Sequence, residues 1–257
     1  MVWDYNDRTP TLRPAGAARL RFIPPQVLGS CKIPYVVWGN DASICHEVPL
    51  FLLEYMEILV PEAYLGQAAA CLVKHLPIFS RKELTSGKPQ GNDQSSNQDK
   101  NQISSLPHYS DKCILLASRK HLRTTADFIL LIPDSTFYFD ATDPDLVQEP
   151  PDCFELPPEF KKTVRVPKFP ALMEGYLKCL DKSKPQFFSK FREYNLSYAT
   201  LSITASVAML VAWRRREPVE RIYDSPDEYP ATLRAIRDCL SPQCAALFDG
   251  IFTTMKD

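Results

Sequence analysis

The sequence predicts an α+β protein in which a small mixed β-sheet with flanking helices is followed by a helical C-terminal region. Short apolar runs rich in β-branched and aromatic residues recur between residues 33 and 132, which is typical of buried strands. After residue 168, apolar residues recur at helical spacing instead. The 257 residues, 45% of them hydrophobic, are enough to bury a core without a metal or a disulfide.

Strands and helices are predicted to alternate in the first part of the chain. Pro61 ends an apolar run, and the acidic Glu62 and basic His75 favour the two ends of a helix between them. The predicted elements, in order, are an irregular lead-in over 1–24, a strand over Ile33–Trp38, a short helix capped by Asn40 or Asp41 and ending near His46, a strand over Leu52–Val60, and a helix over Glu62–Leu76.

A polar low-complexity tract over 85–107 predicts a disordered insertion, because it holds almost nothing to bury. The segments predicted after it are strands over Lys112–Ala117 and Asp127–Ile132, a shorter apolar run over Thr136–Phe139, and a proline-rich extended connector over 144–168. The helical region, 169–257, has predicted helices over Phe169–Leu180, Pro185–Arg216, Tyr229–Leu240 and Pro242–Met255.

The uncharged stretch Asn195–Trp213 has two interpretations. It reaches the roughly 18 residues that a membrane span requires, but it carries several Ser and Thr residues, which favour a helix buried within the protein. The span remains the alternative. The N-terminus lacks the apolar core of a signal peptide, and the eight cysteines form no C-x-x-C pair. These features predict a cytoplasmic protein with free thiols.

Charge and glycine usage exclude several classes of protein. With 30 basic and 31 acidic residues, the chain offers no overall attraction for phosphate backbones, so general nucleic-acid binding is not expected. The 8 glycines form neither G-x-G-x-x-G nor G-x-x-x-x-G-K-[ST], which excludes Rossmann and Walker-type nucleotide sites.

Two segments, 35–42 and 55–61, carry a family resemblance. The first reads Tyr-Val-Val-Trp-Gly-Asn-Asp-Ala and the second Tyr-Met-Glu-Ile-Leu-Val-Pro. Together they resemble the opening of a nucleotidyltransferase fold, including that of a group of uncharacterised fungal proteins. The resemblance implies a nucleotidyltransferase-like domain over 25–143. It also implies a strand ending in a small-residue turn, a short helix, and a second strand whose Asp-x-Asp carboxylates hold metal ions that position a nucleoside triphosphate.

The chain departs from this pattern at the residues that perform the chemistry. Strand residues two apart point the same way, which lets Asp-x-Asp hold a metal pair. The equivalent positions here are Tyr55 and Glu57, so one acid is missing. Trp38 replaces the first small residue of the turn. Glu57 is the candidate catalytic acid, and the candidates for a third acid on a later strand are Asp127 and Asp140. The turn residues Trp38, Gly39, Asn40 and Asp41 are the candidate binding residues.

Two further groups could bind ligands. Arg119, Lys120 and Arg123 form the best local positive patch, which suits either a phosphate group or a solvated loop. Cys71 and His75 lie four apart on a predicted helix and could share one face as metal ligands, although the sequence offers no second pair at suitable spacing.

The sequence therefore predicts a degenerate, catalytically inactive relative of nucleotidyltransferases with a binding or regulatory role and no cofactor. One alternative is an active Mg²⁺-dependent nucleotidyltransferase, for which Mg²⁺ would be the cofactor. The other is a protein-interaction module that uses the C-terminal helices to contact a protein partner.

Overall fold

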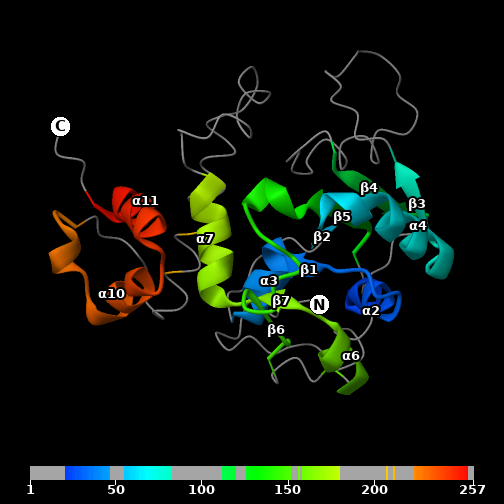
Figure 1. Ribbon diagram of the computed structural model, residues 1–257, viewed down its shortest axis with the longest axis horizontal. Coiled ribbons are helices and arrows are strands. Elements are labelled where there is room, and N and C mark those ends of the chain that lie inside the picture. The colour runs from blue at the N-terminus through cyan, green and yellow to red at the C-terminus, as the bar shows by residue number, and fades with distance from the viewer. Residues whose placement is uncertain are drawn as a thin grey trace, which may run out of the picture.

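A computed structural model describes residues 21–46, 55–82, 112–119, 126–151, 156, 158–179, 207, 211 and 223–253. It confirms the predicted class: a mixed five-stranded sheet with flanking helices comes first, and helices follow at the C-terminus (Figure 1). The strands are β1 (Val36–Trp38), β2 (Tyr55–Val60), β3 (Phe79–Lys82), β4 (Ile114–Ser118) and β5 (Phe128–Pro133).

The sheet has the strand order β1-β2-β5-β4-β3. Its central pair, β2 and β5, is parallel, and every other neighbouring pair is antiparallel. Two parallel strands must be joined by a crossover connection. The crossover from β2 to β5 starts with the 3₁₀ turn η1 (Glu62–Tyr64) and the helix α4 (Leu65–His75). A second, two-stranded antiparallel sheet joins β6 (Val147–Gln148) to β7 (Val166–Pro167). The amide of Val37 in β1 donates to the carbonyl of Arg165, just before β7.

The helices lie on both faces of the five-stranded sheet (Figure 1). The remaining elements are α2 (Ile23–Ser30), α3 (Gly39–Cys45), α6 (Pro158–Thr163), α7 (Phe169–Cys179), α10 (Ala231–Asp238), α11 (Pro242–Phe252), and the 3₁₀ turns η2 (Asp134–Phe137) and η5 (Pro226–Glu228).

Two apolar cores follow from the alternation of side chains along the strands. On one face, called here the α7 face, Trp38, Leu59 and Leu130 pack with α7, α10 and α11. On the other, called the α4 face, Ile58 and Ile129 pack with α2, α4 and α6. Both cores are buried, so the central strands are apolar on both sides except at Glu57, as parallel strands usually are.

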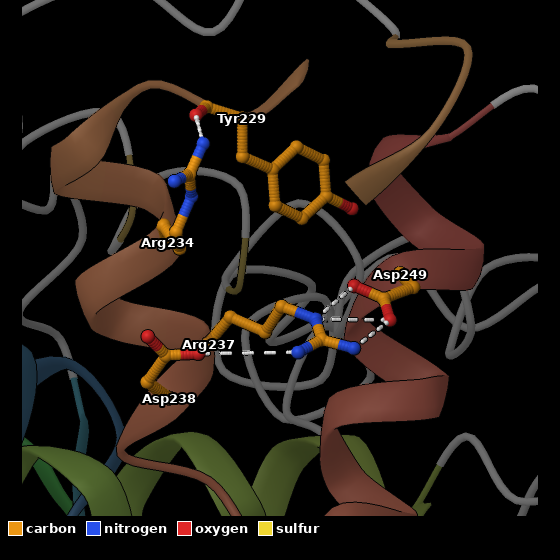
Figure 2. A network of polar contacts seen from close by, with 5 residues as sticks. All are labelled: Tyr229, Arg234, Arg237, Asp238 and Asp249. Atoms are coloured by element: carbon orange, nitrogen blue, oxygen red, sulfur yellow. Dashed lines mark hydrogen bonds and ion pairs between the residues drawn. The ribbon is translucent and has the colours of Figure 1, made fainter. Parts of the chain in front are cut away.

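The C-terminal helices are joined to each other by a polar network (Figure 2). The Nε of Arg237 on α10 lies 2.8 Å from one carboxylate oxygen of Asp249 on α11, and its Nη2 lies 2.8 Å from the other. Arg234 donates to the backbone carbonyl of Tyr229 at 3.1 Å. Burial raises the pKa of the Tyr229 phenol, and the neighbouring Asp249 charge adds to the rise. The bidentate pair links α10 to α11.

Most predicted elements are confirmed, with ends that differ by a few residues. The helix predicted from Phe169 is α7, and those predicted from Tyr229 and Pro242 are α10 and α11. The short helix after β1 forms, but neither Asn40 nor Asp41 caps it, because it already begins at Gly39.

Four features differ from the prediction. The lead-in reaches into α2, whose first turn accepts Pro24 and Pro25 because the opening amides of a helix need no intrahelical partner. The first half of the apolar run Thr136–Phe139 lies in the 3₁₀ turn η2, which is followed by a left-handed Tyr138. The connector 144–168 is not wholly extended, since it contains the helix α6 between the extended strands β6 and β7. The edge strand β3 has no apolar alternation that would have indicated it.

Several predictions lie wholly or mainly outside the described residues. They concern the insertion over 85–107 and the helix over Pro185–Arg216, of which Val207 and Val211 are described and buried on the α7 face. Within the described ranges, no helix is long and apolar enough to cross a membrane.

Gly175 of α7 lets the helix approach the sheet closely. A β-carbon there would lie 2.7 Å from the Trp38 indole. We expect Gly175→Ala to lower the free energy of unfolding by about 1–3 kcal/mol through overpacking. In the control Gly66→Ala, the new methyl meets open space on α4, and we expect stabilisation of up to about 1 kcal/mol. Urea denaturation measures both; equal effects would contradict the close approach.

Glu174 joins α7 to the start of α11. It accepts hydrogen bonds from the Ser241 amide at 2.7 Å and pairs with Lys178 at 2.9 Å. Burial opposes ionisation, but the hydrogen bonds from Lys178 and Ser241 outweigh it and lower the pKa of Glu174. A lowered folded-state pKa contributes stability above the unfolded-state pKa, and that stability is lost as pH falls through the folded-state pKa.

We therefore expect Glu174→Gln to cost about 0.5–1.5 kcal/mol at neutral pH, with the difference from the parent vanishing in acid. Urea denaturation across pH measures this. The control is Glu228→Gln, which removes the same charge from an exposed carboxylate of η5. A pH-independent loss for Glu174→Gln would assign the effect to shape alone.

Candidate functional site

The turn between β1 and α3 lies directly against the side chain of Glu57. Gly39, the first residue of α3, has a φ of 60°, a left-handed conformation that glycine adopts without strain. A β-carbon at Gly39 would occupy the place of the Glu57 carboxylate. Glycine is therefore needed twice here, for its backbone conformation and for the space that it leaves to the acid.

Glu57 is buried, with 4% of its surface exposed, on the α7 face of the sheet. Its cross-strand neighbours are Trp38 on β1 and Leu130 on β5, and both of these side chains are apolar and buried. Directly opposed side chains lie about 5 Å apart, so these two are the strand positions from which a second acid could best approach Glu57. Neither carries a carboxylate.

Tyr55 occupies the position where the resemblance implies the other acid. It packs partly buried against the same core as Leu59, which places the alternate residues of β2 on one face as the sequence predicts. Its backbone carbonyl accepts a hydrogen bond from the Arg21 guanidinium at 2.8 Å. Its phenol ring packs against the core of the α7 face.

Asp41 forms a buried ion pair with Arg21. The guanidinium Nε and Nη2 lie 2.8 and 2.7 Å from the two carboxylate oxygens, and both side chains are at most 2% exposed. A bidentate pair of this kind satisfies both charges. Asp41, a candidate binding residue from the sequence, is thereby committed to a contact within the protein.

Tyr176 of α7 faces this region from above the sheet. Burial raises the pKa of its phenol well above the usual value, the negative charge of Glu57 raises it further, and a hydrogen bond with Ser43 opposes the rise. The phenol therefore keeps its proton. The Ser43 hydroxyl donates to the carbonyl of Gly39 at 3.0 Å, which connects the phenol to the turn.

Trp38 is completely buried and packs against three aromatic rings. Its ring centroid lies 5.0 Å from that of Phe137, 5.2 Å from that of Phe139 and 5.7 Å from that of Tyr176. Its indole Nε1 is buried without a hydrogen-bond partner. The tryptophan thus fills the space between β1 and α7 and points into the core.

The two candidates for a third acid lie apart from Glu57. Asp127 immediately precedes β5, three positions before Leu130, which lies opposite Glu57. By strand alternation Asp127 is in phase with Ile129 on the α4 face. Asp140 is exposed, and hydrogen bonds from Thr142 lower its pKa.

Sequence reasoning missed two residues of the region, Arg21 and Tyr176, and also a buried acid elsewhere in the fold, Asp134. Asp134 follows β5, and its carboxylate accepts hydrogen bonds from the amides of Ser135 and Ala141. Burial nevertheless raises its pKa. No local pattern indicated Arg21, which pairs with Asp41, or Tyr176, which faces Glu57 from α7. Asp134 had a local signal, since an acid after a strand-ending proline is typical of a turn.

The predicted positive patch is described at Arg119 alone, which is exposed at the end of β4; Lys120 and Arg123 lie outside the described residues. The remaining turn residue, Asn40, is half-buried in the first turn of α3.

Among the described residues, one group of acidic, cysteine or histidine side chains is close enough together to share a metal ion. It consists of Cys31, Cys71 and His75, on the α4 side of the sheet. Glu57 belongs to no such group there. The region around Glu57 is thus a closed arrangement of one buried acid, a phenol, a hydroxyl and a neighbouring ion pair.

Comparison with protein-family models, with curated proteins and with solved structures finds no match.

The fit between Gly39 and Glu57 can be tested by a double-mutant cycle. We expect Gly39→Ala to cost more than about 2 kcal/mol, since it combines a left-handed alanine with a collision against the carboxylate. In a Glu57→Ala background the collision is removed, and we expect the cost to fall to the roughly 1–2 kcal/mol of the backbone term. Chemical denaturation of the four proteins measures the coupling. The same cost in both backgrounds would contradict the arrangement.

Proposed function

We propose that this protein is a nucleotidyltransferase-like scaffold that acts by binding or regulation and does not transfer nucleotides. The observation that carries the proposal is the surroundings of Glu57. Its carboxylate packs against Gly39, is almost entirely buried, and has Trp38 and Leu130 as cross-strand neighbours. Nucleotidyl transfer by two metal ions needs several acidic oxygens converging on an open site.

The order of elements supports the nucleotidyltransferase-like part of the proposal. β1 ends at the Trp38–Gly39 turn, the short helix α3 follows, and β2 then presents Glu57. The later strand β5 lies directly beside β2. This is the succession that the resemblance implies, with a later strand placed where a third acid could stand.

The loss of catalysis is supported by the replacements at those positions. Tyr55 stands for one acid, and Leu130 lies beside Glu57 on β5. Trp38 and the Arg21–Asp41 pair pack around the turn, so side chains of the protein fill the space next to Gly39. Function resides in sites and not in folds, so a protein can keep this fold after it has lost the catalytic residues.

The alternative of a helical interaction module gains no specific support from the described residues. In that part of the chain, the exposed large hydrophobic side chains are Tyr64 and Val73, which lie on η1 and α4 and not on the C-terminal helices. A large exposed apolar patch would be the usual mark of such a surface.

The experiment combines a transfer assay with ligand binding. We expect the purified chain, supplied with Mg²⁺ and each of the four ribonucleoside triphosphates, to transfer no nucleotide to protein or RNA acceptors. We expect a binding role to appear as a rise in melting temperature with a nucleotide that persists in EDTA and in Glu57→Gln. Mg²⁺-dependent transfer that disappears in Glu57→Gln, but not in the exposed control Glu228→Gln, would establish the active-enzyme alternative instead.

A further inference from the structure

Two cysteines and a histidine meet at the contact between α2 and α4, on the face of the sheet opposite Trp38. The ligand atoms of Cys31, Cys71 and His75 all lie within 4.8 Å of one another. The two sulfur atoms are 2.6 Å apart, and both cysteines are free thiols. The α4 helix supplies Cys71 and His75, four residues apart on one face.

The turn that ends α2 brings Cys31 to this position. The amide of Lys32 donates to the carbonyl of Gly29, and that of Ile33 donates to the carbonyl of Leu28. These two bonds form a Schellman motif, with Lys32 in the left-handed conformation at a φ of 56°. Glycine usually fills that position, so the lysine costs backbone strain where Cys31 is presented to α4.

We propose that Cys31, Cys71 and His75 form a binding site for a soft divalent cation of the zinc(II) class. Two thiolates and one imidazole are the ligands that zinc prefers, and three protein ligands leave a fourth position for water. His75 is exposed and both cysteines are partly buried, so solvent reaches the site from the His75 side.

The geometry needs little adjustment to accept the cation. Tetrahedral zinc with Zn–S bonds of about 2.3 Å holds its two sulfurs roughly 3.7 Å apart. The thiols must therefore separate by about 1 Å, within reach of small side-chain rotations at the end of α2.

Binding is a proton-for-metal exchange. The cation forms two Zn–S bonds and one Zn–N bond, both S–H bonds break, and two protons pass to the solvent. Two adjacent thiolates repel each other, but a divalent cation between them neutralises both charges. The affinity must therefore fall steeply as pH falls.

The test uses the full chain, reduced with a non-thiol phosphine and freed of metal, and titrated with Co²⁺ as the spectroscopic probe. We expect one equivalent to bind with a sulfur-to-cobalt charge-transfer band and tetrahedral d–d bands, all displaced by one equivalent of Zn²⁺. We also expect release of two protons per metal ion and a higher melting temperature.

Variants assign the site. Cys31→Ser and Cys71→Ser should each lose most of the charge-transfer band. His75→Gln, at an exposed position that cannot disturb the core, should keep the band but weaken binding at least about tenfold, since even outer-shell partners contribute roughly 10–100-fold. Cys239→Ser, at an exposed cysteine after α10, is the matched control and should bind as the parent does.

Two results would overturn the proposal. One is a reduced chain that takes up neither Co²⁺ nor Zn²⁺ at micromolar concentration; if such a chain forms a Cys31–Cys71 disulfide on exposure to air, the pair would be assigned to thiol oxidation. The other is a charge-transfer band that persists unchanged in both cysteine variants, which would place the metal on other thiols.

Discussion

The burial of one carboxylate, that of Glu57, organises the centre of this protein. Burial of an acid in an apolar layer costs several kcal/mol of folding free energy unless polar groups surround the carboxylate. Here the turn at Gly39 leaves room for the carboxylate, and Tyr176 with Ser43 supplies polar surroundings from α7 and α3. The close approach of α7, which Gly175 permits, seals the arrangement. The packing of α7 on the sheet and the conformation of the turn therefore depend on each other.

This dependence connects the fold to the proposed function. A catalytic acid that binds metal ions must be open to solvent. Glu57 instead lies beneath a helix and beside a tryptophan that packs against three aromatic rings. Asp41, the other acid of the turn, is neutralised by Arg21 in a fully buried pair. Both acids near the turn are therefore buried and make contacts within the protein. The proposed cation site lies on the opposite face, where partly buried thiols and an exposed imidazole remain accessible.

The sequence predicted those elements whose signals are local. β5 and α7 show apolar patterns that leave little choice, and both appear close to their predicted ends. α2 escaped prediction because its two prolines are typical of loops, although the first turn of a helix accepts them. β3 escaped because an edge strand with exposed Arg81 and Lys82 has no apolar alternation.

The candidate site, like the fold, was predictable where the signal lies in neighbouring residues. The spacing of residues along β2 placed Glu57 and Tyr55 on one face, and the structure bears out that part. The contacts that decide the chemistry come from far along the chain: Arg21 precedes the turn, Tyr176 follows it by more than a hundred residues, and Cys31 meets Cys71 across two helices. No local pattern encodes a meeting of that kind, because it depends on how the layers stack.

The parallel pairing of β2 with β5 has a consequence for synthesis on the ribosome. As the chain emerges, β1, α3 and β2 follow α2, but the inner edge of β2 finds its partner only after Phe128–Pro133 has been made. The cover over Glu57 arrives later still, with α7. Before Phe128–Pro133 is made, β1 and β2 can pair only with each other, and this two-stranded ribbon has an open edge, is too small to be stable alone and is prone to pair with other chains. A truncation after α4 would therefore produce an aggregating fragment and not a smaller domain.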